Sequence, residues 1–292
     1  MCKIIDIFPV FQTYWADAEH KSVEDQIESW AKEYMLPWPE LLSKQIEDYA
    51  AQNLIWQQVA REKVFPHLAE RLPAMQEAHG NLLELCKPIY SKAQNTLCFE
   101  SSATFVIYVG IGCGAGWVTT FCGSPAILFG LENIAESGWS DPDAITGLIA
   151  HEIGHLVHYH WRSQHGKPIG SGPFWQLYEE GFAQDCECRI RNTEIVHQAK
   201  GSKDDDWIEW CQAHAGRLAA EFLKTVDSAG SVSPFFGSWF EIGGKSETGY
   251  FLGQEVVKEM EKRLTLKEIA LLDNVDDRLR SILDGMVKRG RY

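Results

Sequence analysis

The chain has 292 residues, of which 45% are hydrophobic, and its formal net charge is −14 at pH 7. This length and apolar content suffice for one large domain or two modest ones. The acidic balance argues against a nucleic-acid partner and against binding to an anionic membrane face. The sequence also contains no apolar run of transmembrane length, so we expect neither nucleic acid nor a membrane among the partners.

The start of the chain lacks the apolar stretch of a secretory signal. The eight cysteines are irregularly spaced and include no C-x-x-C pair. In a protein of this size that pattern favours reduced thiols over a disulfide framework. We therefore expect a cytoplasmic location.

Residues 22–92 have a helical pattern in which charged and apolar residues alternate. Pro37 and Pro39 interrupt this pattern, and we expect a kink or break at Pro66 and a helix end at Pro73. No catalytic pattern occurs in this part of the chain. We expect residues 1–98 to form an N-terminal helical region packed on a core of residues 99–292, together one compact unit.

Three segments predict strands because they are rich in β-branched and aromatic residues: 102–109, 117–121 and 124–131. The glycine-rich residues 110–116 between the first two do not open a helix, so they do not match a dinucleotide-binding fingerprint. A bend between strands is the better interpretation. The sequence thus predicts a small sheet before the central helix.

A helix is predicted after residue 140. Ser140 suits the N-cap position, and Asp143 follows three residues later, where a capping box places an acidic partner. Pro142 is compatible with the first turn of a helix. Apolar residues then recur at helical spacing through Val157.

This helix carries the most informative motif of the chain, His151-Glu152-Ile153-Gly154-His155, which reads H-E-x-x-H. Residues four apart on a helix face the same way, so His151 and His155 are able to bind one zinc ion. Glu152 is then placed to take a proton from a zinc-bound water molecule. The alternative is a surface helix that carries two histidines by chance.

A catalytic zinc site usually has three protein ligands and one open position. The class that takes a third histidine six residues after the second is not supported, because Trp161 occupies that position. Glu180 lies 25 residues after His155, on a second predicted helix (175–191) that follows a loop rich in glycine, serine and proline. Glu179 is a rival ligand, and a solvated acidic helix start is the alternative for both.

Glu180-Gly181-Phe182-Ala183 resembles the E-G-[FL]-A signature that follows H-E-x-x-H in gluzincin metallopeptidases, which include the aminopeptidase-N-like enzymes. The chain is more similar to a poorly characterised bacterial family of predicted zinc-dependent proteases. The resemblance covers about residues 100–260 and implies a zincin-like fold. It also implies that His151, His155 and Glu180 bind zinc and that Glu152 is the general base.

The resemblance extends to two further segments. The Tyr-x-x-Gly sequence that begins at Tyr250 is similar to the tyrosine segment that stabilises the oxyanion in aminopeptidase-N-like enzymes, although an aromatic residue at a helix start often serves packing. By the same resemblance, residues 129–132 form the sheet edge that pairs with the substrate. Glu132-Asn133 matches only the end of the exopeptidase motif, so exopeptidase specificity is not supported.

Other residues near the motif favour packing over metal binding. Cys186 and Cys188 are two positions apart, so on a helix they point in nearly opposite directions. His158 lies one turn beyond His155 and is expected beside the site rather than as a ligand. The acidic run from Lys203 to Asp206 is expected to be a solvated surface.

The sequence therefore predicts an α+β, mainly helical protein with a zincin-like core, a small mixed sheet and an N-terminal helical region. The expected function is that of a zinc-dependent peptidase acting on peptides or proteins. One alternative is a binding or regulatory protein with a structural metal closed by a fourth ligand, such as His158 or a cysteine. Another is a protease dedicated to one protein target, like the H-E-x-x-H proteases that cleave bacterial repressors. Oligomeric state and endo- versus exo-cleavage are not fixed by the sequence.

Overall fold

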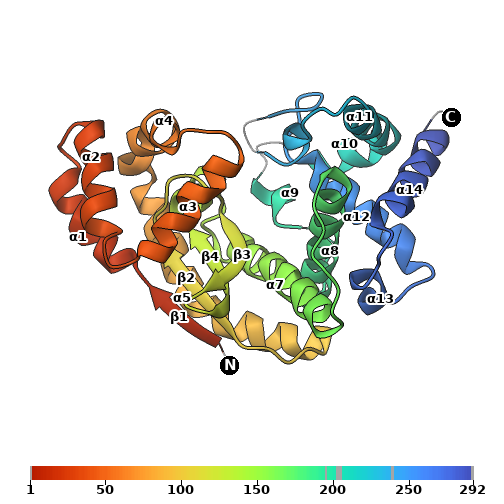
Figure 1. Ribbon diagram of the computed structural model, residues 1–292, viewed down its shortest axis with the longest axis horizontal. Helices are drawn as coiled ribbons and strands as arrows, with labels where there is room; N and C mark the ends of the chain where they lie inside the picture. The colour runs from red at the N-terminus through yellow and green to blue at the C-terminus, as the bar shows by residue number, and fades with distance from the viewer. Residues whose placement is uncertain (1, 195, 202–205, 238–239, 291–292) are drawn as a thin grey trace. The chain divides into compact units, whose positions relative to one another are not determined.

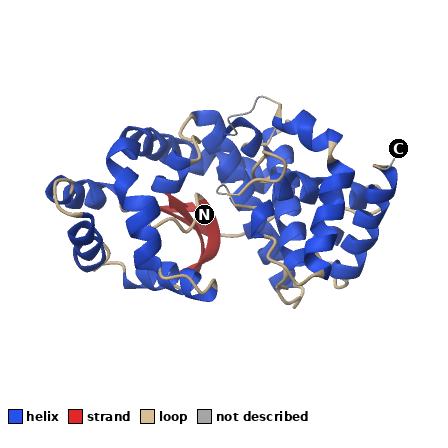
Figure 2. Ribbon diagram, turned by 90° about the horizontal axis from the view of Figure 1, so that it is seen from above, coloured by secondary structure: helices blue, strands red, loops and turns tan. Residues whose placement is uncertain are grey.

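The computed structural model describes residues 2–194, 196–201, 206–237 and 240–290. The protein is mainly helical, and its strands form one mixed four-stranded sheet (Figure 2). This confirms the predicted α+β class with a small mixed sheet. By their internal contacts the residues form two compact units, which comprise Met1–Gln94 with Glu100–Glu152 and Asn95–Phe99 with Ile153–Tyr292. We expected a boundary at residue 98 between an N-terminal helical region and the core, and that boundary stays a prediction.

The first unit contains the sheet, whose strand order is β1-β2-β4-β3. The strands are β1 (Cys2–Asp6), β2 (Ala103–Tyr108), β3 (Gly116–Phe121) and β4 (Ser124–Gly130). β1, β2 and β4 run parallel, and β3 is antiparallel to β4. The three predicted strands are confirmed. β1 was not predicted, because its five residues are mostly half-buried and show no clean alternation of apolar and polar side chains.

The predicted substrate edge at residues 129–132 is wrong. Phe129 pairs with Ile107 of β2 on one side and with Gly116 of β3 on the other, so β4 is an inner strand. The last two residues of that segment belong to α6 (Leu131–Glu136). The cause is the tight turn before β4, where Cys122 and Gly123 have φ of 49° and 72°. Positive φ at both central residues is the type I′ hairpin geometry, which folds β3 onto the outer side of β4.

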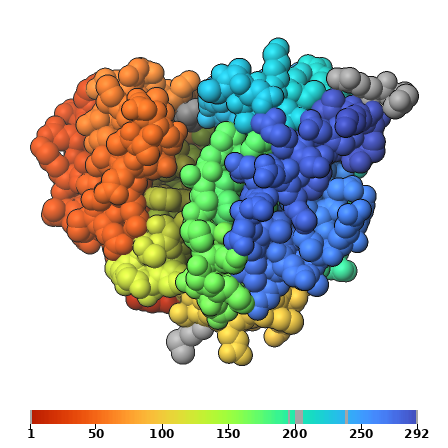
Figure 3. All heavy atoms as spheres, turned by 45° about the vertical axis from the view of Figure 1, so that its right-hand side comes forward, coloured from red at the N-terminus to blue at the C-terminus, as the bar shows by residue number. Residues whose placement is uncertain are grey.

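The N-terminal helices of the first unit are α1 (Phe8–Ala18), α2 (Val23–Ser29), α3 (Pro39–Ala51), α4 (Trp56–Val59) and α5 (Leu68–Leu97), with short π and 3₁₀ turns between them. Residues before α5 form a continuous surface, orange in Figure 3. The predicted helix end at Pro73 is wrong, since α5 continues through Pro73 and Pro88. Each proline costs about 3 kcal/mol in a helix interior. The buried stripe of α5, which includes Met75, Leu82 and Tyr90, offsets this cost.

The second unit is helical. Its elements are α8 (Pro173–Arg191), α9 (Gln198–Gly201), α10 (Trp207–Ala213), α11 (Ala215–Asp227), α12 (Thr248–Glu261), α13 (Leu266–Ala270) and α14 (Val275–Arg289). Figure 1 shows α8 and α12 side by side. They touch backbone to backbone at Gly181 and Gly253, where a Cβ atom on either glycine would overlap the other helix. Among the described residues, no helix is long and apolar enough to cross a membrane.

The helix with the H-E-x-x-H motif is α7 (Pro142–Gln164). The boundary between the compact units falls inside this unbroken helix, directly after Glu152. The predicted N-cap is off by one residue, because Asp141 Oδ1 accepts hydrogen bonds from the backbone N–H groups of Asp143 and Ala144 at 2.9 and 3.1 Å. Ser140 Oγ instead donates a hydrogen bond to Glu77 at 2.7 Å. Asp141 is therefore the residue that caps the helix.

The predicted acidic surface falls mostly on Lys203–Asp205, which lie outside the described residues. Asp206, the one described member of that run, accepts a hydrogen bond from Lys245 Nζ at 2.6 Å.

Candidate metal centre

The motif residues are buried on α7. His151, Glu152 and His155 are 3%, 4% and 8% exposed, although all three side chains are polar. Burial of such groups is costly unless a partner compensates for the lost water. Gly154, between the histidines, explains how the next helix comes close. A Cβ atom there would lie 2.8 Å from Ala183 Cα and 2.9 Å from Cys186 Cβ, so only glycine permits this approach of α8.

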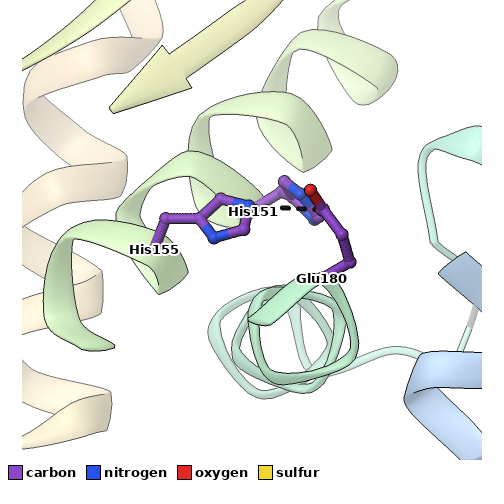
Figure 4. A group of neighbouring side chains, drawn as sticks. All are labelled: His151, His155 and Glu180. Carbon is purple, nitrogen blue, oxygen red and sulfur yellow. Dashed lines mark ion pairs between the residues drawn. The ribbon is translucent and has the colours of Figure 1, made fainter. Parts of the chain in front are cut away.

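Three of the predicted residues come together where α7 meets α8. One ligand atom each of His151, His155 and Glu180 lies within 4.8 Å of the other two, and Figure 4 shows Glu180 reaching from α8 toward both imidazoles. His151 and His155 are one turn apart on the same continuous helix, so the helix itself sets their spacing.

The spacing within this group fits a metal ion. His155 Nε2 and Glu180 Oε2 are 3.3 Å apart, which is longer than a charge-assisted hydrogen bond. Two ligands at the usual zinc distances and a tetrahedral angle are about 3.4 Å apart. Two imidazoles and one carboxylate are also a donor set found in catalytic zinc sites. The three side chains are therefore able to hold a metal ion.

The two adjacent glutamates of α8 have different surroundings. Glu179 Oε2 accepts hydrogen bonds from Trp175 Nε1 at 2.9 Å and from Tyr159 OH at 3.2 Å. Burial raises the pKa of Glu179, with a smaller lowering effect from His155. In the described residues Glu179 belongs to neither group of potential metal ligands, whereas Glu180 does. The structure thus favours Glu180 over its rival.

His158 lies one turn beyond His155 but is surrounded by aromatic rings. Its side chain is fully buried, and its Nε2 is 3.1 Å from Tyr178 OH. Tyr178 donates its own proton to the carbonyl oxygen of Ile269 at 2.5 Å, so it accepts one from His158. Burial lowers the pKa of His158 to about 3, and the nearby charges of His155 and Arg162 act in the same direction. This histidine is a neutral packing residue, as the sequence suggested.

A second group of buried ligand atoms, which the sequence did not reveal, also includes His151. Its other members are Glu187 of α8 and His197, and the three ligand atoms again lie within 4.8 Å of one another. Glu187 is seven residues after Glu180, so the two lie on one helix face. This spacing is visible in the sequence and indicates that Glu187 lies near the metal ligands. His197 lies outside any long helix, so no periodicity points to it.

The edge strand β3 passes directly beside Glu152. A Cβ atom on Gly116 would lie 2.7 Å from Cγ, Cδ and Oε1 of Glu152, so the absent side chain leaves room for the carboxylate. Gly116 is the first residue of β3, at the edge of the sheet. Among the described strands, β3 therefore forms the sheet edge beside the predicted general base.

Tyr250 lies on the first turn of α12 and is half-buried, with its ring 5.7 Å from that of Phe236 in an edge-on contact. Three residues later Gly253 touches Gly181, the neighbour of Glu180. This places the first turn of α12 near the glutamate of α8, but the role of the tyrosine side chain stays a prediction. Glu247, which precedes α12, has a φ of 59°, and burial raises its pKa to about 7.

Comparisons with protein-family models, curated proteins and solved structures give no match for this chain. The functional argument therefore rests on the arrangement of the side chains themselves.

Proposed function

We propose that this chain is a zinc-dependent peptidase with a zincin-like core. His151, His155 and Glu180 would bind the ion, and the observation that carries the proposal is the 3.3 Å separation of His155 Nε2 and Glu180 Oε2. That distance matches the separation of about 3.4 Å expected between two ligands of one tetrahedral zinc ion. The burial of both motif histidines supports the same conclusion.

A zinc ion bound there supplies a Lewis acid that polarises a carbonyl group and makes a water molecule more acidic. Glu152 follows His151 directly on α7 and would take the proton of the attacking water on its carboxylate. The same carboxylate would then deliver the proton to the leaving amine. Gly116 contributes by leaving the space in which this carboxylate lies. Tyr250 is proposed as the phenol donor for the developing oxyanion.

The substrate would bind as an extended chain along the outer side of β3. An edge strand offers unpaired backbone N–H and C=O groups that a peptide can extend by strand addition. Because β3 begins beside Glu152, a peptide bound there would pass the general base. This proposal replaces residues 129–132 as the substrate edge and favours peptides and unfolded segments as substrates.

The main alternative is a closed structural metal site, which needs a fourth protein ligand. The sequence suggested His158 or a cysteine for that role, and neither is placed as a ligand. His158 is hydrogen-bonded to Tyr178, and among the described residues no cysteine joins either group of potential ligands. Both observations favour a site with an open position, which is the arrangement of a catalytic zinc.

The test is the Glu152→Gln variant. We expect it to retain about one zinc ion per chain, because Glu152 is not a ligand, and to lose about 10³-fold in peptide hydrolysis. Zinc content is measured by mass spectrometry of the metal, and hydrolysis on a defined mixture of unstructured peptides. Glu84→Gln, an exposed glutamate on α5, is the matched control and should retain full turnover.

Undiminished zinc-dependent turnover in Glu152→Gln would remove Glu152 from the mechanism. Zinc binding without any peptide hydrolysis by the unmodified protein would instead favour the structural metal site. Hydrolysis of a single folded protein, with none of the peptide mixture, would indicate a protease dedicated to one target.

A further inference from the structure

We infer that Glu187, held by His197 and Arg191, is a positioning residue that fixes the ring of His151. This inference rests on the proposed zinc site and adds to it residues from outside the family-like motif. His151 belongs to both groups of potential ligands. An imidazole has two ring nitrogens, so one can face an ion while the other faces a hydrogen-bonding partner.

The contacts of Glu187 show a carboxylate that is already compensated. The residue is fully buried, and its Oε1 accepts from Arg191 Nη1 at 2.6 Å and from the backbone N–H of His197 at 2.8 Å. Its Oε2 is 2.8 Å from His197 Nδ1. Arg191 supplies a buried positive charge, since its side chain is only 6% exposed. The charge of Glu187 is therefore compensated by Arg191 without a metal ion.

These contacts argue against a second metal site. The distance of 2.8 Å between Glu187 Oε2 and His197 Nδ1 is that of a hydrogen bond. Two zinc ligands would lie about 3.4 Å apart, close to the separation seen between His155 and Glu180. The positively charged guanidinium of Arg191, which is hydrogen-bonded to the Glu187 carboxylate, would also repel a divalent ion. The second group is thus a hydrogen-bonded network beside His151.

The chain is arranged to build this network. Glu187 lies two turns after Glu180 on the same face of α8, and each of the two glutamates belongs to a group that contains His151. α8 ends at Arg191, and the left-handed conformation of the next residue, Asn192, turns the chain back. This return places His197 against Glu187, ten residues after it in sequence. The segment after α8 is therefore coupled to the orientation of a zinc ligand.

The test is the zinc dissociation constant of Glu187→Gln, measured by competition with a chromophoric chelator. We expect zinc to bind about 10- to 100-fold more weakly, with stoichiometry still near one, as is typical when the partner of a metal-binding histidine is lost. The visible spectrum of the cobalt-substituted protein should also change, because the His151 ring is no longer fixed. Neither readout depends on hydrolysis.

Asp185→Asn is the matched control. Asp185 is also a buried carboxylate on α8 and is also paired with an arginine four residues later, Arg189, at 2.6 Å. It belongs to neither group of potential ligands among the described residues. We expect Asp185→Asn to lower thermal stability as Glu187→Gln does, but to leave the zinc dissociation constant and the cobalt spectrum unchanged.

If Glu187→Gln does not fold, His197→Gln tests the same network while keeping the pair of Glu187 and Arg191, and it should weaken zinc binding to a smaller extent. Zinc affinity that equals that of the Asp185→Asn control in both variants would overturn the inference. Complete loss of zinc in Glu187→Gln, with retention in Glu180→Gln, would also overturn it by making Glu187 a ligand. Failure of the proposed function alone would appear differently, as normal zinc binding without hydrolysis.

Discussion

Two glutamates on the side of α8 that faces α7, Glu180 and Glu187, have different surroundings. At one end, Glu180 lies 3.3 Å from His155, a separation that suits two ligands of one ion. At the other end, Glu187 lies 2.8 Å from His197 and is paired with Arg191. His151 is common to both groups.

The difference shows how two carboxylates on one helix face acquire different surroundings. Glu187 has an arginine as its counter-charge, so the charge of that end is balanced by the protein alone. Glu180 lies beside His151 and His155, and two imidazoles with one carboxylate form a donor set that suits a divalent ion. The comparison supports the proposal that the end with Glu180 binds the metal ion and that the end with Glu187 orients the ring of His151.

The largest effect is expected from removing the ligand at the first end. Glu180→Gln should lower zinc content from about one ion per chain to well below half after gel filtration, because only two protein ligands remain. Glu179→Gln is the control, since its carboxylate accepts from Trp175 and Tyr159 instead. Unchanged zinc content in Glu180→Gln, with loss in Glu179→Gln, would reverse the assignment of the two glutamates.

A smaller effect is expected beside the general base. In Gly116→Ala the new methyl group would overlap the Glu152 carboxylate, whose atoms lie 2.7 Å from the ideal Cβ position. Because displacement of a catalytic group by about 1 Å costs about 100-fold in rate, we expect a loss of that size with zinc content unchanged.

Gly123→Asn, at the turn that follows β3, is the matched control for this variant. Gly123 has a φ of 72° and open space around it, and asparagine tolerates that conformation. Equal turnover of both variants would show that β3 does not position Glu152.

A buried carboxylate that belongs to neither group sharpens the comparison, because it is held by backbone amides. Glu132 is 1% exposed and accepts from the N–H groups of Gly110 and Gly112 at 2.7 and 3.1 Å. Burial raises its pKa from 4.5 to about 7, despite the lowering effect of these two donors. Folded Glu132 therefore keeps a proton that the unfolded chain releases between these pH values.

The stability contributed by this raised pKa is complete below pH 4.5 and is lost as pH rises through 7. We expect the free energy of unfolding, relative to Glu132→Gln, to fall by about 2–3 kcal/mol between pH 5 and 8. Urea unfolding of the metal-free proteins at several pH values measures this difference. A difference that stays constant, or grows with pH, would show that the two amides keep Glu132 ionised.

Much of the architecture follows from local patterns in the sequence. The strands β2, β3 and β4 follow from segments rich in β-branched and aromatic residues, and the helix α7 follows from its cap and the helical spacing of its apolar residues. The spacing of His151 and His155, and the position of Glu180 on the next helix, follow from the same periods. These features depend on residues that are close in sequence.

The features that sequence reading missed depend on distant contacts. β1 is defined by its pairing with β2, about a hundred residues later, and β3 is the sheet edge only because its hairpin folds outward. The helix α5 continues through two prolines because its buried side offsets their cost. His197 joins the network through a chain reversal that leaves no periodic signal.

The most direct test of the central claim is a crystal structure of the zinc-loaded protein with anomalous diffraction measured at the zinc absorption edge. The account predicts one strong peak about 2.0–2.2 Å from His151, His155 and Glu180, with a fourth position open to solvent. A peak bonded to His151, Glu187 and His197, or one closed by a fourth protein ligand, would contradict it.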